Sequence, residues 1–131
     1  MKLHLTTAND KQLITGYSNE LGKSWVEVNK KRYEYSLIVL PDELITNWQV
    51  TDFFNLNTNN FEDIALLSTT KLKLEVVLLG TGSKHHFAHP RLSCCLTDAG
   101  ISVEYMATDA ACRTYNFLMA EGRAVAAALI I

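Results

Sequence analysis

The sequence predicts an α/β layered domain, and two observations lead to that prediction. Residues 72–131 alternate apolar runs with helix signals in the order strand, helix, strand, helix, strand. The first third of the chain is rich in aromatic and β-branched residues, which favour strands. Strands joined by helical crossovers are normally parallel, with right-handed connections. We therefore expect a three-stranded parallel core, covered by helices, which the N-terminal strands extend or fold over.

The first half of the chain reads mainly as short strands. The expected strands are residues 12–18, 24–28, 32–40 and 45–50. Residues 29–31 predict a hairpin loop, and Pro41 ends its second arm. Apolar residues at near-helical spacing then predict a helix over 61–68, with Asn59 or Asn60 as its cap.

The second half has clearer boundaries. The expected strands are 72–80, 101–106 and 123–131, and the expected helices are about 90–99 and 109–121. Pro90 suits the first turn of a helix, and Gly100 and Gly122 suit left-handed helix ends. Thr108 is expected to cap the second helix through its hydroxyl group.

Length and composition indicate one ordinary domain spanning 1–131. The chain has 131 residues, 48% of them hydrophobic and 20% charged, and its net charge of −2 does not favour nucleic acid or an anionic membrane as a partner. We see no signal peptide and no stretch of the roughly 20 apolar residues that a transmembrane helix needs. Three cysteines, an odd number, favour free thiols in a reducing cytoplasm.

The stretch VVLLGTGSKHHFAHPRL, residues 76–92, is the first candidate site. Ligands of open parallel sheets bind at the carboxyl ends of strands, and helix N-termini attract anions. We expect either a tight turn from strand to helix or a small-anion pocket here. A dinucleotide site is disfavoured because His85 stands where its third glycine belongs, and a Walker loop is absent. The expected pocket residues are Gly80, Gly82, Lys84, His85, Thr108 and Arg113.

Histidines and cysteines raise two further alternatives. The donor atoms of a zinc site would come from His85, His86, His89 and Cys94 or Cys95. No established zinc spacing is present, so a solvated histidine-rich loop is the alternative. Cys112, near a helix start, is either a nucleophile with His85 or His86 as its base or a buried structural cysteine. Neither pattern forms a complete constellation, so we expect no catalytic residue, no cofactor and no metal.

The helix expected over 109–121 contains a polar residue that needs partners. Two faces of this helix are partly apolar, which predicts that the helix is largely buried. A buried side-chain amide must be hydrogen-bonded. Asn116 is therefore expected to bond to a neighbouring loop, with a ligand contact as the alternative. Glu121 and Arg123 should lie at the opposite edge of the sheet and form a structural ion pair or part of a protein contact.

Two quoted segments carry a family resemblance. LLGTG at 78–82 and GISVEYMATDAACRTYNFLMAEGRAVAAALI at 100–130 resemble a small domain family of unknown function that includes the mitochondrial NADH:ubiquinone oxidoreductase (complex I) assembly factor three. The resemblance is strongest over 78–131. The matching positions are Gly80, Gly82, Gly100, Thr108, Ala111, Asn116, Phe117, Glu121, Gly122 and Arg123.

The resemblance implies a fold and a kind of partner. It implies a single three-layer α/β domain with a mixed central sheet, the C-terminal parallel core and an additional N-terminal β layer. The mitochondrial relative binds another assembly factor and early complex I subunits, and no catalysis is ascribed to it. Because no mitochondrial leader is visible, the resemblance implies a bacterial, cytoplasmic member.

These observations leave three functional hypotheses. The leading one is a non-enzymatic protein-binding module, an assembly or maturation helper for a respiratory complex. The second is a small-anion or nucleotide-binding protein, or a small enzyme, using the edge around Gly82, Lys84, Thr108 and Arg113. The third is a homodimer formed through an exposed sheet edge or helix.

Overall fold

The computed structural model describes residues 11–18, 23–70 and 72–131. Residues 1–10, on which the expectation about an N-terminal targeting segment rests, lie outside the described residues. The described strands are β1 (Ile14–Ser18), β2 (Trp25–Val28), β3 (Lys31–Tyr33), β4 (Leu37–Val39), β5 (Leu44–Ile45), β6 (Val76–Gly80), β7 (Ser102–Met106) and β8 (Val125–Leu129). The helices are the 3-10 helix η1 (Phe53–Asn55) and the α-helices α2 (Thr58–Ala65), α3 (Pro90–Asp98) and α4 (Thr108–Ala120).

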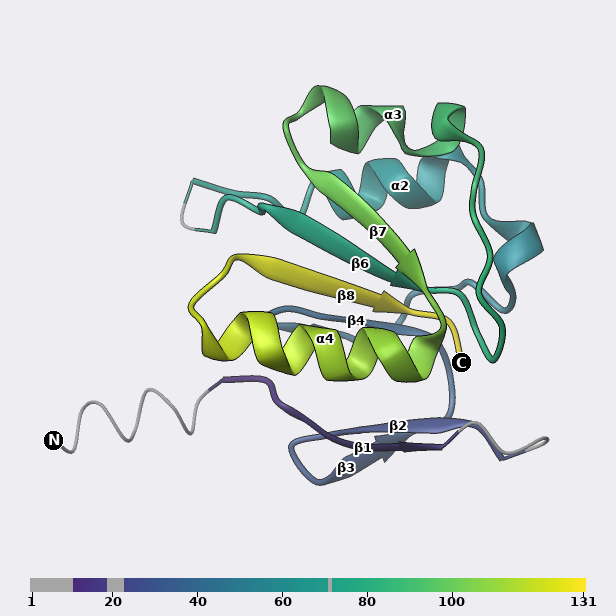
Figure 1. The fold of residues 1–131 in the computed structure, drawn as a ribbon, viewed down its shortest axis with the longest axis vertical. Helices are drawn as coiled ribbons and strands as arrows, with labels where there is room; N and C mark the ends of the chain where they lie inside the picture. The colour runs from purple at the N-terminus through teal and green to yellow at the C-terminus, as the bar shows by residue number, and fades with distance from the viewer. Residues whose placement is uncertain (1–10, 19–22, 71) are drawn as a thin grey trace, which may run out of the picture.

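A mixed central sheet forms the middle layer, with the strand order β5-β4-β8-β6-β7. Strands β8, β6 and β7 run parallel, as the sequence predicts; β4 pairs with β8 in antiparallel orientation, and β5 pairs antiparallel with β4. Figure 1 shows α2 and α3 on one face of this sheet and α4 on the other, with β1, β2 and β3 beyond α4. The predicted α/β architecture with an additional β layer is confirmed.

The two faces of the central sheet bury separate apolar cores. Alternate residues of β6 face opposite sides, so Val77 and Leu79 pack with α2 and α3 while Val76 and Leu78 pack with α4. Strand β6 is buried throughout, which explains why its sequence is an unbroken apolar run. Full burial of an apolar side chain of this size stabilises the fold by about 1.5–3 kcal/mol.

The N-terminal strands both extend the central sheet, through β4 and β5, and fold over it, through β1, β2 and β3. β1, β2 and β3 form a separate antiparallel sheet, whose hairpin turn holds Asn29 and Lys30 at φ of 49° and 73°. Positive φ at both turn residues is the geometry that a tight hairpin needs. The predicted strand 32–40 is wrong as a single element, because the chain leaves the small sheet after Tyr33 and enters the central sheet at Leu37.

Two further predictions in the first half are wrong in detail. The strand expected over 45–50 is present only as Leu44–Ile45, after which the chain leaves the sheet although Trp48 and Val50 remain buried. Helix α2 begins about a turn earlier than predicted, at Thr58. Its cap is Asn57, which accepts from the Asn60 N–H while the Asn60 side chain accepts from the Asn57 N–H.

The C-terminal helices match the predicted ranges closely. Pro90 is the first residue of α3, and Gly100 and Gly122 follow α3 and α4 with φ of 80° each. The predicted capping role of Thr108 is wrong. Ala107 occupies the cap position, and Thr108 lies inside the first turn of α4 with its hydroxyl engaged elsewhere.

That hydroxyl joins three segments at the carboxyl end of the parallel strands. It donates to the carbonyl of Ile130, after β8, at 2.7 Å, and accepts from the Gly82 N–H, after β6, at 2.9 Å. The Thr108 N–H returns a bond to the Gly82 carbonyl at 2.8 Å. We call Gly80, Gly82, Thr108 and Ile130 the strand-end clasp. Gly80 belongs to it because a Cβ there would lie 3.0 Å from Thr108 Oγ1 and 3.1 Å from Thr108 Cα.

Cys112 lies in the core beneath α4, with 1% of its surface exposed. Burial is the main cause that raises the pKa of its thiol to about 12, with a further contribution from the neighbouring Asp109 carboxylate. A thiol held protonated in this way is not a nucleophile. The geometry therefore favours the structural alternative for Cys112 over the catalytic one.

The clasp predicts a matched pair of stability measurements. Replacing Thr108 by Val keeps the side-chain shape but leaves the Gly82 N–H and the Ile130 carbonyl without their partner. We expect the free energy of unfolding in urea to fall by about 2–4 kcal/mol, because each orphaned buried group costs about 1–3 kcal/mol. Thr108→Ser retains the hydroxyl and should lose no more than about 1 kcal/mol. Equal losses in the two variants would contradict the clasp.

The burial of Cys112 predicts selective thiol chemistry. With its pKa near 12, the Cys112 thiol carries roughly a thousandfold less thiolate than a thiol with the reference pKa near 9. We expect Ellman's reagent at about pH 8 to modify the exposed Cys94 readily and Cys112 only after denaturation. Mass spectrometry of proteolytic peptides measures both. Native Cys112 labelled as fast as Cys94 would show that the core opens there.

Candidate functional site

The carboxyl ends of β6, β7 and β8 meet at one end of the sheet, and the loop of residues 81–89 connects β6 to α3 there (Figure 1). Buried Thr81 fixes the start of this loop. Its N–H donates to the Met106 carbonyl at 2.8 Å, which ties the loop to β7. Its hydroxyl lies 2.6 Å from the Lys84 carbonyl and accepts from the His86 N–H. The loop is therefore a defined turn that presents its following side chains outward.

Aromatic rings gather on this loop and on η1. His86 stacks on Phe53 with ring centroids 5.0 Å apart and meets Phe54 edge-on at 5.0 Å. His85 lies against Phe87 at 4.4 Å. Phe54 and Phe87 are 78% and 75% exposed, which is high for such large apolar side chains. We call Phe53, Phe54, Lys84, His85, His86 and Phe87 the aromatic loop surface.

The glycine and threonine of the predicted anion pocket are brought together, but they bind each other. The Gly82 N–H and the Thr108 N–H, both needed for an anion, are engaged within the strand-end clasp. The carboxylate of Asp109 lies in the first turn of α4, where it interacts favourably with the positive end of the helix dipole and repels an incoming anion. The protein's own groups thus occupy this helix start.

The remaining pocket residues do not converge on one point. Arg113 turns to β1, where its Nη1 donates to the Tyr17 hydroxyl at 2.7 Å, and it also lies 3.7 Å from Asp109. Lys84 and Gly82 line a hollow of about 270 Å³, together with Thr51, Ser83 and the acidic Asp52. The anion pocket stays a prediction, now centred on Lys84 and Gly82.

Two sequence-predicted contacts have different partners in the structure. Asn116 bonds to a strand rather than to a loop, since its amide donates to the Ile14 carbonyl at 2.6 Å and accepts from the Ile14 N–H at 2.9 Å. The expected ion pair between Glu121 and Arg123 is wrong. Arg123 instead pairs with Glu75 at 2.6 Å, and this hydrogen bond is the main cause that lowers the pKa of Glu75.

The histidines of the loop point to separate partners. His85 and His86 contact phenylalanine rings, and His89 Nδ1 accepts from the Arg91 N–H at the start of α3. Across residues 11–18, 23–70 and 72–131, no three histidine, cysteine or acidic side chains gather as a metal site would require. In the same ranges, no helix has both the length and the apolarity needed to cross a bilayer.

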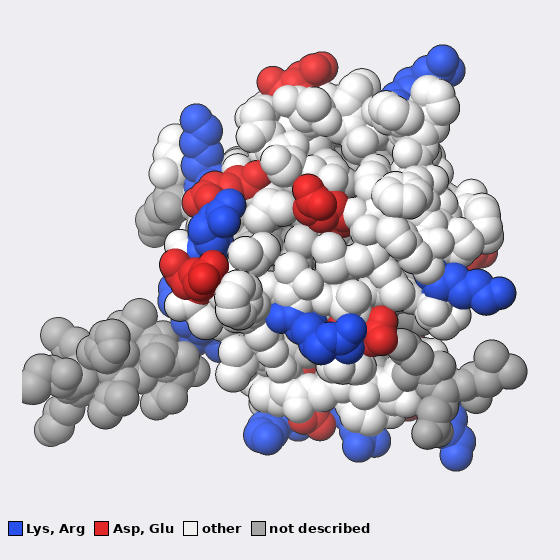
Figure 2. Space-filling view, in the orientation of Figure 1, with Lys and Arg blue, Asp and Glu red and all other residues white. Residues whose placement is uncertain are grey.

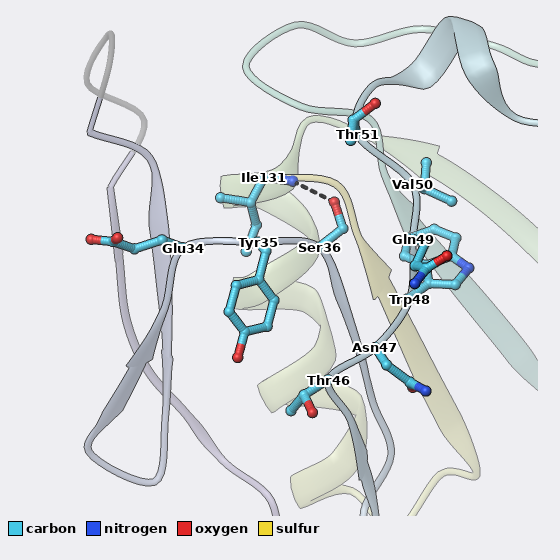
Figure 3. A pocket seen from close by; sticks show the side chains of 10 residues that line it. All are labelled: Glu34, Tyr35, Ser36, Thr46, Asn47, Trp48, Gln49, Val50, Thr51 and Ile131. Carbon is cyan, nitrogen blue, oxygen red and sulfur yellow. Dashed lines mark hydrogen bonds between the residues drawn. The ribbon is translucent and has the colours of Figure 1, made fainter.

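A groove opens beside the point where β5 leaves the sheet (Figure 3). The β4–β5 ladder has the hydrogen-bonded pairs Leu40–Glu43 and Ile38–Ile45, so the next pair in register would join Ser36 to Asn47. Within the described chain those backbone groups form no such bond. Residues 34–36 and 46–51 instead line a groove of about 540 Å³.

Both walls of the groove carry aromatic and polar side chains, with Tyr35 beside Ser36 on one and Trp48 beside Asn47 on the other. Tyr35, 55% exposed, projects from one side, and Figure 3 shows Thr46, Asn47 and Gln49 on the facing segment. Sequence reasoning missed this site because it interpreted 45–50 as a paired strand. It also missed Phe53 and Phe54, whose visible signal is two adjacent aromatics within a polar stretch.

Comparison with known proteins places the chain in a family. The family model described as "Protein of unknown function (DUF498/DUF598)" matches residues 18–130. The mouse protein named NADH dehydrogenase [ubiquinone] 1 alpha subcomplex assembly factor 3 is 35% identical over 92 residues, which are 70% of this chain and 48% of the mouse protein. The chain thus spans about half the length of that relative.

Bacterial relatives match over more of their length. The 13 kDa major membrane protein of Francisella tularensis subsp. holarctica (strain LVS) is 27% identical over 126 residues, covering 96% of this chain and 99% of that protein. A crystal structure of a Bordetella parapertussis protein superposes with a TM-score of 0.81 at 33% identity, covering 92% of this chain and 95% of that one. These matches confirm the resemblance carried by the C-terminal segments, and the chain belongs to the DUF498/DUF598 family of proteins of unknown function.

Proposed function

We propose that the chain is a partner-binding module that assists the assembly of a multisubunit respiratory complex. The observation that carries the proposal is the interrupted β4–β5 ladder. Within the described chain it leaves the backbone groups of Ser36 and Asn47 unpaired on facing walls of a groove whose volume suits a bound segment. An extended peptide can pair with such backbone groups and place its side chains against the walls.

The groove offers both kinds of contact that peptide recognition uses. The backbone of Ser36 and of residues 46, 47 and 49 forms no hydrogen bond within the described chain, so donors and acceptors are available to a partner. Tyr35 adds an exposed aromatic ring, a residue type that is enriched at protein interfaces. The name of the mouse relative, an assembly factor of an NADH dehydrogenase, supports a respiratory complex as the setting.

Small-anion binding is the second candidate function. The observation that favours it is Lys84, which forms no salt bridge within the described residues and borders the 270 Å³ hollow beside Gly82 and Ser83. A lysine ammonium with nearby hydroxyl groups can bind phosphate as a point charge. The engaged Gly82 N–H makes this the weaker of the two proposals.

Photo-crosslinking tests the groove. A photoreactive phenylalanine analogue in place of Tyr35 should capture discrete proteins in living cells, and mass spectrometry should identify respiratory-complex subunits or assembly factors among them. The control carries the same analogue at Phe117, which is 65% exposed on α4, away from the groove lining. Absence of Tyr35 adducts, or identical adducts at both positions, would contradict partner binding in the groove.

Thermal unfolding tests the anion candidate. If phosphate binds at the hollow, a concentration about 100 times its dissociation constant should stabilise the fold by about 2.7 kcal/mol and raise the unfolding midpoint. Lys84→Ala should abolish that rise, whereas Lys73→Ala, which removes an exposed cation elsewhere, should leave it unchanged. A midpoint that phosphate does not move would exclude the site.

A further inference from the structure

The loop that carries the aromatic surface has a one-sided charge. Residues 76–97 contain no aspartate or glutamate, but they include Lys84, Arg91 and three histidines, in a chain whose net charge is −2. Neither Lys84 nor Arg91 forms a salt bridge in the described part of the chain. By contrast, Arg113 and Arg123 lie beside Asp109 and Glu75. The loop and the first turn of α3 therefore keep one cation each, Lys84 and Arg91, available for an external anion.

The apolar part of the same surface is also unpartnered. Phe54 and Phe87 expose most of their side chains. Phe54 lies against the His86 ring that stacks on Phe53, and Phe87 lies against His85 and Tyr105. The flank along which Figure 1 draws the loop from β6 to α3 is largely white in Figure 2, with blue side chains projecting from it. Exposed aromatic rings rimmed by polar groups mark sites of protein association.

Asp52, the acidic cap of η1, lines the same hollow as Lys84 but forms no salt bridge with it. Both carboxylate oxygens of Asp52 are engaged locally, one by the Phe54 N–H at 2.6 Å and the other by the Asn55 amide at 3.1 Å. Asp52 thus acts as the cap of η1. An incoming acid meets Lys84 and Arg91 without displacing an existing ion pair.

We infer that the aromatic loop surface, with Arg91, docks an acidic polypeptide segment that also carries apolar side chains. Its carboxylates face Lys84 and Arg91, and its apolar side chains cover Phe54 and Phe87. The inference rests on the proposed function as a partner-binding module and specifies the chemistry of the partner. Thr51 and Ile131 border both the groove and the hollow lined by Phe54 and Lys84, so one partner can follow both surfaces.

The charges favour a peptide over a membrane or a nucleic acid. Lipid headgroups are typically recognised by clusters of four to eight basic residues, and here residues 76–97 have two permanent cations, Lys84 and Arg91. Nucleic acid binding likewise depends on a basic patch able to neutralise several phosphates. Two exposed cations in one stretch with the exposed Phe87 instead match an acidic segment with interspersed apolar residues.

Fluorescence anisotropy with synthetic peptides tests the inference. The probe is a labelled peptide of Asp and Glu with interspersed Leu and Phe, and its analogue has Asn and Gln in place of the acids. We expect the acidic peptide to bind the wild-type chain and the analogue to bind at least about tenfold more weakly at low salt. Raising the salt concentration from about 0.05 M to about 0.5 M should weaken binding of the acidic peptide, since exposed charges are screened.

Matched variants locate the surface. Lys84→Glu with Arg91→Glu should weaken binding of the acidic peptide at least about tenfold and reverse its salt dependence, because the new carboxylates repel the peptide and salt screens that repulsion. Phe54→Ala with Phe87→Ala should weaken it at both salt concentrations. Lys73→Glu and Phe117→Ala make the same chemical changes elsewhere on the exposed surface and should leave binding unchanged. An unchanged thermal midpoint verifies that each variant is folded.

Three outcomes overturn the inference. They are equal binding of the acidic peptide and its amide analogue, no binding of either, and binding of phosphatidylglycerol vesicles without binding of the peptide, which would assign the surface to a membrane. Crosslinking through Tyr35 separates this failure from failure of the proposed function. If the Lys84→Glu, Arg91→Glu variant still captures its partner normally, the groove function stands and the acidic-segment inference is wrong.

Discussion

The close approach of the start of α4 to the ends of β6 and β8 is the constraint on which the rest of the structure depends. One buried hydroxyl, that of Thr108, serves the Gly82 N–H and the Ile130 carbonyl at once. The approach is possible because Gly80 has no side chain, since a Cβ would press on Thr108 at 3.0 Å. The clasp fixes where β6 ends, and so fixes where the loop of residues 81–89 starts. The hollow of the aromatic loop surface lies beside that loop, and the groove shares Thr51 and Ile131 with the hollow.

The elements that were predictable from the sequence are those whose signals are local. Pro90, Gly100 and Gly122 mark helix ends by their own backbone preferences, and each lies where predicted. The apolar run at 72–80 indicated a strand buried on both faces by composition alone, and the structure has that strand as Val76–Gly80. Residues 32–40 and 45–50 were predicted less well, because both segments have strand patterns that tertiary structure interrupts. The chain must pass from one sheet to the other between Tyr33 and Leu37, and no local preference records that change of partner.

The candidate site was harder to predict than the fold. Sequence reasoning found the right end of the sheet, since the carboxyl ends of parallel strands must coincide. It grouped Arg113 with Lys84 by charge, but a contact with Tyr17, 96 positions away in the chain, takes Arg113 to β1. The Asn116 amide likewise forms its hydrogen bonds with Ile14, a partner 102 positions away. Long-range contacts of this kind decide which polar side chains remain available, and periodicity does not reveal them.

The concentration of candidate surfaces at one end follows from how the parallel strands are connected. At the opposite end, α3 and α4 return to the sheet through short turns at Gly100 and Gly122, which leave little chain to present side chains. At the carboxyl end, residues 81–89 connect β6 to α3. Strand β5 ends there after Ile45, so the residues that follow it are unpaired. Irregular backbone there can be fixed by a few bonds, such as those of Thr81, while its side chains stay exposed. A rigid clasp below an outward-facing loop is therefore an arrangement in which partner contacts can change without loss of the core.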